Sequence, residues 1–364
     1  MAMAVGLHQL LLSPTTYYTT TPPAAAASPC RRRRRRLLST PAWSHRSGPT
    51  STVAAAASRT SEQSSSTRRK QQQVTLKLTY LEINSWVWEV HQQHQAAPLR
   101  ILVDPLVVGN LDFGMPWLYD GAKKNPKVKA LGVDDLLAPD ARPDLLIITN
   151  RLDDHCHVRT LTQLSARAPD LPVVTTPNAR AVLASLPTPF RHVTYLEPGE
   201  STAVSPDVRV LATAGTLLGP PWERPENGYV LLMPAGADAD DRNGLLYYEP
   251  HCLHDRSFLE RKRVRADVVI TPVVKQLLPL PLPGNYYTLV SGQEDAVDLA
   301  GMLRARYVVP MSNADLDAGG LLTTVLTEQG TTQSFQALLS EALPQVQVLD
   351  PTPGVPLHLD LELH

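Results

Sequence analysis

Short apolar runs, each bounded by glycine, proline or polar residues, recur along the chain from Val74 onward. Runs of about four to eight residues that are rich in branched and aromatic side chains are typical of β-strands. Residues 74–90 alternate and then fill with large side chains, which predicts two strands that meet near Asn84 and Ser85. The further runs that predict strands are 100–104, 145–148, 172–175, 208–212, 229–233, 245–248, 268–271 and 307–310.

Helical patterns are short and lie between these runs. Residues 291–294 read Ser-Gly-Gln-Glu, a capping box in which the serine hydroxyl and the glutamate satisfy each other's backbone donors. The helix that follows is expected to extend to about Arg304, with one face made by Ala296, Leu299, Ala300 and Leu303. Other predicted helices are 158–168, 177–185, 256–263 and 334–343, whereas 110–129 and 276–285 are predicted to be loops.

A first half rich in strands, followed by a mixed half, predicts two packed sheets with helices on their outer faces. The expected fold class is therefore α/β, an αββα four-layer sandwich formed by residues 74–364 as one domain. About 290 residues are ample for such a core. The sequence contains no internal repeat, no glycine-rich phosphate loop and no Gly-x-Ser-x-Gly elbow, so a nucleotide-binding loop and a serine nucleophile of that type are not expected.

Residues 1–73 differ in composition from the rest of the chain. They hold eleven Lys or Arg and one acid, Glu62, so this segment carries +10 and leaves −11 for the remainder of a chain with net charge −1. Abundant Ser, Thr, Ala and Arg without sustained apolar periodicity are typical of a disordered transit peptide. The uncharged opening to Ser28 favours a plastid over a mitochondrion, and the chloroplast stroma is the expected location. The rival interpretation of the six arginines 31–36 is a nucleic-acid or nuclear-targeting patch.

Charge and cysteine content narrow the expected partners of residues 74–364. A net charge of −11 argues against broad attraction to a phosphate backbone, so nucleic acid is not expected as a partner. No apolar run approaches the ~20 residues of a membrane helix, which predicts no membrane span. Only Cys156 and Cys252 remain beyond the transit segment, which is consistent with a reducing compartment. A small-molecule substrate is the expected partner.

Candidate metal ligands cluster behind two of the predicted strands. Asp154, His155 and His157 follow the strand 145–148. Glu249-Pro-His-Cys-Leu-His254 follows the strand 245–248, and it offers Glu249, His251 and His254. Loops at strand ends are where α/β folds tend to place chemistry. The alternative is that each acid and histidine hydrogen-bonds its neighbours and fixes a loop, as buried polar groups generally do.

The order of these segments resembles that of the metallo-β-lactamase-fold hydrolases, in a divergent branch of plant or cyanobacterial type. Ile101-Leu-Val-Asp-Pro105 matches a motif of that branch, and residues 147–155 lie where the family writes Thr-His-x-His-x-Asp-His. Residues 212–216 with 227–231, 245–249, and 293–296 with 308–310 are similar to the later strands and closing helix of the family. The resemblance spans about Tyr80 to Asn313 and implies the αββα fold and a metal-dependent hydrolase.

The metal motif of the family is degenerate in this chain. Asn150 and Leu152 stand at its first two histidines, Thr216 or a neighbour at the third, and Ser312 near the last. Leucine cannot bind a metal, so the usual two-zinc site is not inherited. The resemblance therefore implies a site that is either lost or rebuilt.

A rebuilt site would join Asp154 and His155 to Glu249 and His251, with His157 and His254 as further candidates. His155 and His157 would point the same way along an extended loop, and His251 and His254 would share a face of a helical turn. Such ligands suit Zn, Fe or Mn. Water bound at an open position on the ion would have a lowered pKa. Asp154 is the catalytic candidate, as the general base that holds this water.

The predicted function is thus hydrolysis of an ester, lactone or phosphoester. The alternatives are a catalytically inactive binding or scaffold protein of the same fold, an iron-dependent oxidoreductase, and a nuclease, against which the negative charge argues.

Overall fold

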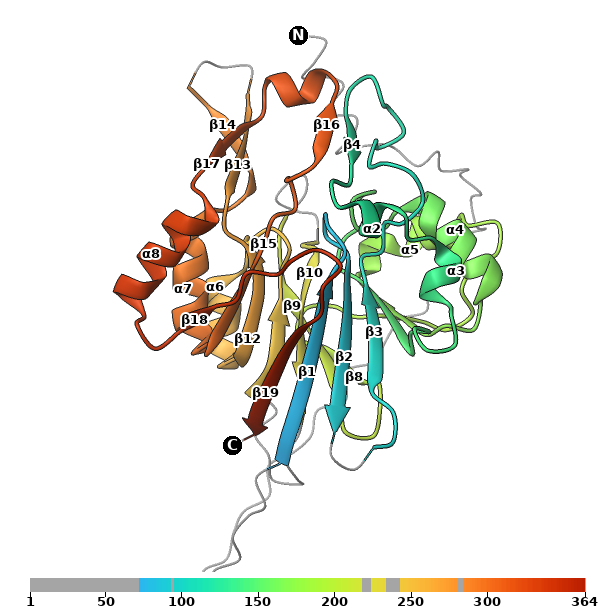
Figure 1. Ribbon diagram of the computed structural model, residues 1–364, viewed down its shortest axis with the longest axis horizontal. Helices are drawn as coiled ribbons and strands as arrows, with labels where there is room; N and C mark the ends of the chain where they lie inside the picture. Colours follow the sequence, from blue (N-terminus) through green and yellow to red (C-terminus); the bar gives the residue numbers. More distant parts are fainter. Residues whose placement is uncertain (1–71, 93–94, 218–223, 234–242, 281–283, 364) are drawn as a thin grey trace, which may run out of the picture. The chain divides into compact units, whose positions relative to one another are not determined.

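Two mixed sheets form the interior of the part of the chain that this computed structural model describes, residues 72–363 except 93–94, 218–223, 234–242 and 281–283 (Figure 1). Within these residues each sheet has seven strands. The first has the order β19-β1-β2-β3-β5-β6-β7 and the second the order β18-β15-β12-β11-β10-β9-β8.

The first sheet takes most of its strands from the early part of the chain. Its strands are β1 (Gln72–Tyr80), β2 (Trp86–Gln92), β3 (Leu99–Val103), β5 (Leu145–Ile148), β6 (Val173–Thr175), β7 (Val193–Tyr195) and β19 (Leu357–Leu363). β1 pairs antiparallel with β2 and β19, whereas β3, β5, β6 and β7 run parallel. Because β3 and β5 run parallel, the residues that follow both strands emerge at the same edge of the sheet.

The second sheet contains β8 (Ser201–Ala203), β9 (Arg209–Ala214), β10 (Asn227–Leu232), β11 (Asn243–Tyr248), β12 (Arg265–Pro272), β15 (Tyr307–Met311) and β18 (Gln347–Val348). Strands β8 to β11 are antiparallel, and β11, β12, β15 and β18 are parallel. The predicted strands are confirmed within a few residues, and β7, β8, β18 and β19 of these two sheets were not predicted.

Apolar side chains from both sheets pack between them and form the main core. Trp86, Trp88 and Ile101 of the first sheet are fully buried in the same cluster as Tyr229 and Tyr248 of the second. The rings of Trp88 and Tyr248 meet edge to face with centroids 5.4 Å apart, a favourable aromatic geometry. Tyr248, at the end of β11, is thereby fixed against the first sheet.

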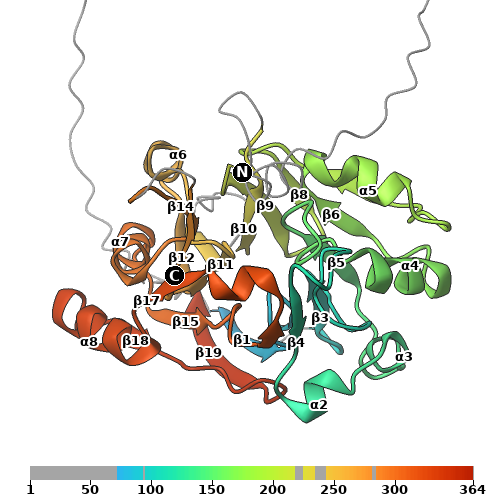
Figure 2. The ribbon, with the colours of Figure 1, turned by 90° about the horizontal axis from the view of Figure 1, so that it is seen from above.

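Helices cover the outer faces of both sheets (Figure 2). α3 (Val133–Leu136), α4 (Val158–Arg167) and α5 (Arg180–Ala184, preceded by the 3₁₀ turn Pro177–Ala179) pack on the first sheet. α6 (Arg256–Lys262), α7 (Gln293–Leu303) and α8 (Thr332–Ala342) pack on the second. The predicted αββα sandwich is therefore confirmed.

Two small sheets lie beyond one end of the sandwich (Figure 1). β13 (Lys275–Pro279), β14 (Tyr286–Val290) and β17 (Thr327–Gln329) form one, and β4 (Asp120–Ala122) and β16 (Asp317–Gly319) form the other. A short helix, α2 (Pro126–Lys129), follows β4, and a 3₁₀ turn, Leu321–Thr324, follows β16. The predicted loops 110–129 and 276–285 are therefore partly wrong, because β4 and β13 pair with segments far away in sequence.

The predicted capping box is also wrong. Helix α7 begins at Gln293, and its N-cap is Gly292, which has no capping side chain. Ser291 lies one residue too early, where its backbone N–H donates to the carbonyl of His251 (2.8 Å). The predicted apolar face is confirmed, since the side chains of Ala296, Leu299, Ala300 and Leu303 are buried.

The predicted transit peptide, residues 1–73, lies outside the described residues except for Gln72 and Gln73, which begin β1. Among the described helices, none combines the length and the apolar character that crossing a membrane requires.

Candidate metal centre

The loops that follow β5 and β11 come from different sheets and meet at one edge of the sandwich. A turn after β5 carries Asp154 and His155, and it is held by N–H donation from His155 and Cys156 to the carbonyl of Leu152 (3.0 and 2.7 Å). His251 comes from the loop after β11. One ligand atom each of Asp154, His155 and His251 lies within 4.8 Å of the others. The structure therefore brings together residues that are almost one hundred positions apart.

Asp104 fixes which ring nitrogen of His155 faces this group. It follows β3, and its Oδ2 lies 2.9 Å from His155 Nδ1. The backbone N–H and hydroxyl of Thr149 also donate to the Asp104 carboxylate, at 2.8 and 2.6 Å. His155 Nε2 is then left facing Asp154, with its closest carboxylate oxygen at 3.1 Å. A carboxylate behind the far nitrogen of a histidine is the usual support of a metal-binding imidazole.

The charges around His155 dominate its electrostatics. Burial lowers the pKa of His155, but the carboxylates of Asp154 and Asp104 outweigh this effect and raise the pKa from 6.5 to about 10. Burial likewise raises the pKa of Asp154, but the charge and hydrogen bond of His155, together with the charge of His251, outweigh it, so this pKa is lowered. The site holds two carboxylates around one imidazole, an excess of negative charge that attracts a cation.

The chemistry of the three side chains and an unpaired oxygen of Asp154 show whether these residues fit a metal ion. Two imidazoles and a carboxylate suit Zn, Fe or Mn. Asp154 Oδ1 is buried and accepts no hydrogen bond, although buried polar atoms nearly always find a partner. The rings of His155 and His251 lie with centroids 5.0 Å apart, close enough to share one ion. The residues therefore fit a single divalent ion.

Glu249, which the sequence also suggested as a ligand, lies outside this group of three in the described structure. Its Oε2 accepts hydrogen bonds from the backbone N–H groups of Leu253 (2.7 Å) and His251 (3.3 Å). Its Oε1 is 3.7 Å from His251 Nδ1. Glu249 therefore shapes the loop that presents His251 through backbone hydrogen bonds, whereas Asp104 contacts the ring of His155 directly.

His157 also lies outside the group of three and has its own partners. It precedes helix α4, and its Nδ1 lies 2.8 Å from the hydroxyl of Thr160, while Arg159 donates to its Nε2 (3.4 Å). Burial, and then the charge of Arg159, lower its pKa to about 4. The sequence suggested that His155 and His157 point the same way along an extended loop. This prediction is wrong, because the chain turns after Leu152.

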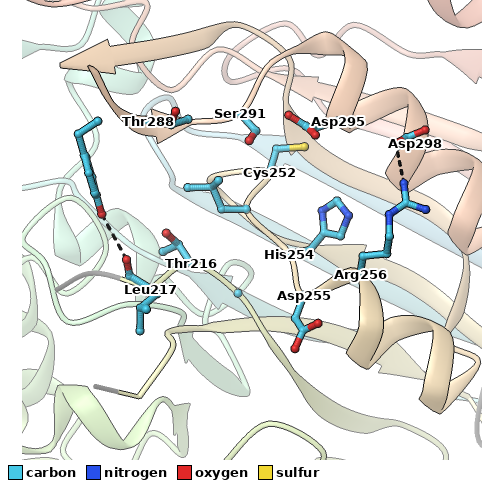
Figure 3. A pocket seen from close by; sticks show the side chains of 13 residues that line it. Thr216, Leu217, Cys252, His254, Asp255, Arg256, Thr288, Ser291, Asp295 and Asp298 are labelled. Carbon is cyan, nitrogen blue, oxygen red and sulfur yellow. Dashed lines mark hydrogen bonds and ion pairs between the residues drawn. The ribbon is translucent and has the colours of Figure 1, made fainter. Parts of the chain in front are cut away.

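His254 lines a separate open cavity of about 550 Å³ between α6, α7 and the loop after β9 (Figure 3). Burial lowers its pKa. Arg256 and Asp298 form an ion pair at the edge of this cavity, with 2.6 Å between guanidinium and carboxylate. His254 and His251 therefore do not share a ligand face. Asp154, His155 and His251 do not line this cavity.

Two residues of the centre, Asn84 and Asp104, were not named by the sequence as site residues. Asp104 was noticed only within Ile101-Leu-Val-Asp-Pro105, although an acid directly after a buried strand met the same criterion as Asp154. Asn84 was noticed only as the place where two strands meet. It is buried, and its amide lies against both Asp154 and His155.

Comparison with known proteins gives a family match over most of the described residues. A model described as a β-lactamase superfamily domain matches residues 77–312. A metallo hydrolase from the hyperthermophilic archaeon Ignicoccus hospitalis is similar in structure, with a TM-score of 0.51 and 16% identity over 79% of this chain and 99% of that chain. The metallo-β-lactamase fold protein YhfI from Bacillus subtilis has a TM-score of 0.47 and 9% identity over 78% of this chain and 99% of its own. No curated protein sequence gives a significant match.

Proposed function

Because the chain belongs to the β-lactamase superfamily, whose domain covers residues 77–312, we propose that it is a metal-dependent hydrolase of an ester, a lactone or a phosphoester. The observation that carries the proposal is the meeting of Asp154, His155 and His251, whose ligand atoms lie within 4.8 Å of one another.

The proposed centre holds one ion, not two. Asn150 and Leu152 replace the first histidine pair of the family, and Asn150 uses its side-chain oxygen to accept a hydrogen bond from the N–H of Leu152 (2.9 Å). Thr216 lines the separate cavity. A donor set of Asp154, His155 and His251 is complete enough for a single ion that keeps open positions for water and substrate.

Each residue has a distinct part in the proposed reaction. A bound divalent ion would polarise the scissile bond and lower the pKa of water. Asp104 holds a proton on His155 Nδ1 and keeps Nε2 directed at the centre. Asp154 has one oxygen near His155 and one without a hydrogen-bond partner, so it can hold the attacking water or take its proton. Glu249 positions the His251 loop.

Metal analysis of the purified protein tests this proposal. The wild type is expected to hold about one equivalent of Zn, Fe or Mn, and Asp154→Ala and His251→Ala are expected to lose it. His157→Ala is the matched control, because it removes a buried histidine of the same loop that lies outside the group of three. Hydrolysis of chromogenic ester, lactone and phosphodiester panels then identifies the substrate class. A wild type that binds no metal under any growth condition contradicts the proposal.

A second candidate function is a catalytically inactive binding protein of the same fold. The observation in its favour is that the His155 ring already has a carboxylate partner at each nitrogen, Asp104 at 2.9 Å and Asp154 at 3.1 Å. The metal analysis separates the two candidates, because the inactive protein would hold no metal. A chelator would then leave its thermal stability unchanged.

We further propose that residues 1–73 direct the protein to the chloroplast stroma. The support is their charge of +10 against −11 for the rest of the chain, together with a Ser, Thr and Ala-rich composition. A fusion of residues 1–73 to a fluorescent protein should accumulate in chloroplasts of a plant cell, and a fusion with alanine at arginines 31–36 tests whether this charge run is needed. Nuclear fluorescence of the first fusion would contradict the proposal.

A further inference from the structure

Asn84 sits in a strained turn that directs it toward the candidate metal centre. The turn connects β1 and β2, and two consecutive residues in it, Glu82 and Ile83, have φ of 63° and 57°. Left-handed backbone is unfavourable for non-glycine residues and persists where the surroundings enforce it. Two tyrosines do so here: Tyr80 donates to the carbonyl of Ile83 (3.0 Å), and Tyr248 donates to that of Asn84 (2.9 Å).

The side-chain amide of Asn84 lies against two of the candidate ligands. One end of the amide is 3.2 Å from Asp154 Oδ2 and 3.1 Å from His155 Nε2. His155 Nε2 and Asp154 Oδ2 are themselves 3.1 Å apart, so the three atoms form an almost equilateral triangle. Ligands in a tetrahedron with bonds of about 2.0–2.1 Å lie roughly 3.3 Å apart. The triangle therefore has the dimensions of one face of a metal coordination shell.

In this structure the corner that Asn84 contributes to the triangle is its amide nitrogen, which donates to the Asp154 carboxylate. The two ends of an asparagine amide have nearly the same shape, and the hydrogen-bond network decides which end faces which partner. A cation between Asp154 and His155 would favour the oxygen end. Asn313 donates to Asn84 Oδ1 (3.4 Å) and to the carbonyl of Pro250 (3.2 Å); it would then keep its bond to Pro250 and lose the longer bond to Asn84.

We propose that Asn84 is the fourth protein ligand of the ion, bound through its side-chain oxygen, and that it replaces a histidine lost from the strand-end motif. This inference rests on the proposed function, since it requires the ion that Asp154, His155 and His251 hold. It also predicts a centre that is richer in oxygen than a purely histidine site, with two oxygen and two nitrogen donors. Such a set favours Mn or Fe more than a histidine-rich site does.

Titration of the apo protein with Co²⁺ and Zn²⁺ tests the ligand role, with affinity and the visible Co²⁺ spectrum as readouts. Asn84→Ala is expected to weaken binding at least tenfold and to change the spectrum, because a donor is lost. Asn84→Asp keeps an oxygen donor and is expected to bind at least as tightly as the wild type, with a similar spectrum. Asn110→Ala is the matched control, because Asn110 also donates to a carboxylate, that of Asp120 (2.8 Å), away from the centre.

The outcomes separate this inference from the proposed function. A wild type that binds Co²⁺, together with an Asn84→Ala variant of equal affinity and unchanged spectrum, overturns the ligand role and leaves the hydrolase proposal standing. A wild type that binds neither ion overturns both. If Asn84→Ala does not fold, Asn84→Asp decides alone, and binding more than tenfold weaker than the wild type contradicts the ligand role.

Discussion

Asp104 is the residue on which the orientation of His155 depends. Its carboxylate accepts from Thr149 twice and contacts His155 Nδ1, so an amide in its place cannot satisfy all three groups. We expect Asp104→Asn to lower metal affinity by about 10- to 100-fold while the protein stays folded. Zinc titration measures this effect. Asp144→Asn, which alters an exposed carboxylate that accepts from the N–H of Arg100 (2.9 Å), should leave the affinity unchanged.

Buried Glu226 is expected to make the stability of the folded protein depend on pH. It is 2% exposed, its Oε2 has no hydrogen-bond partner, and burial raises its pKa from 4.5 to about 7, against the opposing effects of Asn178 and Arg151. Because the folded pKa is raised, the neutral form is favoured in the fold, and stability present below pH 4.5 is lost as the pH rises through about 7.

Glu226→Gln removes this loss, because glutamine stays neutral. We expect the variant to be more stable than the wild type by up to about 3 kcal/mol at pH 8.5, and of similar stability at pH 4.5. Urea unfolding at the two pH values measures the difference. An equal difference at both pH values would contradict this prediction, because it would show that folding does not raise the pKa of Glu226.

Part of the centre could be predicted from the sequence with one criterion, which was an acid or a histidine in a loop that follows a predicted strand. That rule found Asp154, His155 and His251, since each follows a clear apolar run. It could not rank Glu249, His157 and His254 below them. The direction of each side chain depends on turns that are held by backbone hydrogen bonds, such as the one from the Cys156 N–H to the Leu152 carbonyl. Asn84 could not be predicted as a site residue, because its turn is held by hydrogen bonds from Tyr80 and Tyr248, which no local pattern shows.

Elements with a local apolar run or a periodic buried face were predictable, and strands that form only by pairing with a distant segment were not. β5, α4 and α7 show their buried faces in local periodicity, so their bounds agree with the prediction within one or two residues. β13 and β4 instead become strands by pairing with β17 and β16, as in Lys275 with Gln329 and Asp120 with Gly319. Their local composition, rich in Pro and Gly, indicated loops, and only the distant partner overrides it.

Helix α7 shows what its predicted apolar face contributes. Leu299 is fully buried between the second sheet and its helical neighbours. We expect Leu299→Ala to lower the free energy of unfolding by about 2–5 kcal/mol, because a buried cavity is left behind. Asp298→Ala, one residue earlier on the exposed face, removes only a surface ion pair with Arg256 and should cost about 0–1 kcal/mol. Urea denaturation compares the two, and equal losses would contradict the assignment of the buried face.

Over the whole chain, the order of segments carried more information than any single motif. The predicted resemblance to metallo-β-lactamase-fold hydrolases, over about residues 80–313, is confirmed by the family match over 77–312. The order of segments is informative because strands and helices are specified by many apolar positions. The resemblance implies ligand histidines at only a few positions, and this chain has Asn150 and Leu152 at two of them although the sandwich forms.

The position of the centre between the sheets links metal binding to the stability of the whole molecule. Asp154 and His155 belong to the β5 loop of the first sheet, and His251 to the β11 loop of the second, so an ion bound by all three would join both sheets and would bind only the folded chain. Free Zn²⁺ at one hundred times its Kd should therefore stabilise the protein by about 2.7 kcal/mol, and a chelator should reverse this. Thermal unfolding with and without metal measures the shift. Asp154→Ala and His251→Ala should each abolish it, because the first removes the carboxylate of the group of three and the second removes the ligand that comes from the second sheet. A shift that persists in both variants would place the ion elsewhere on the protein.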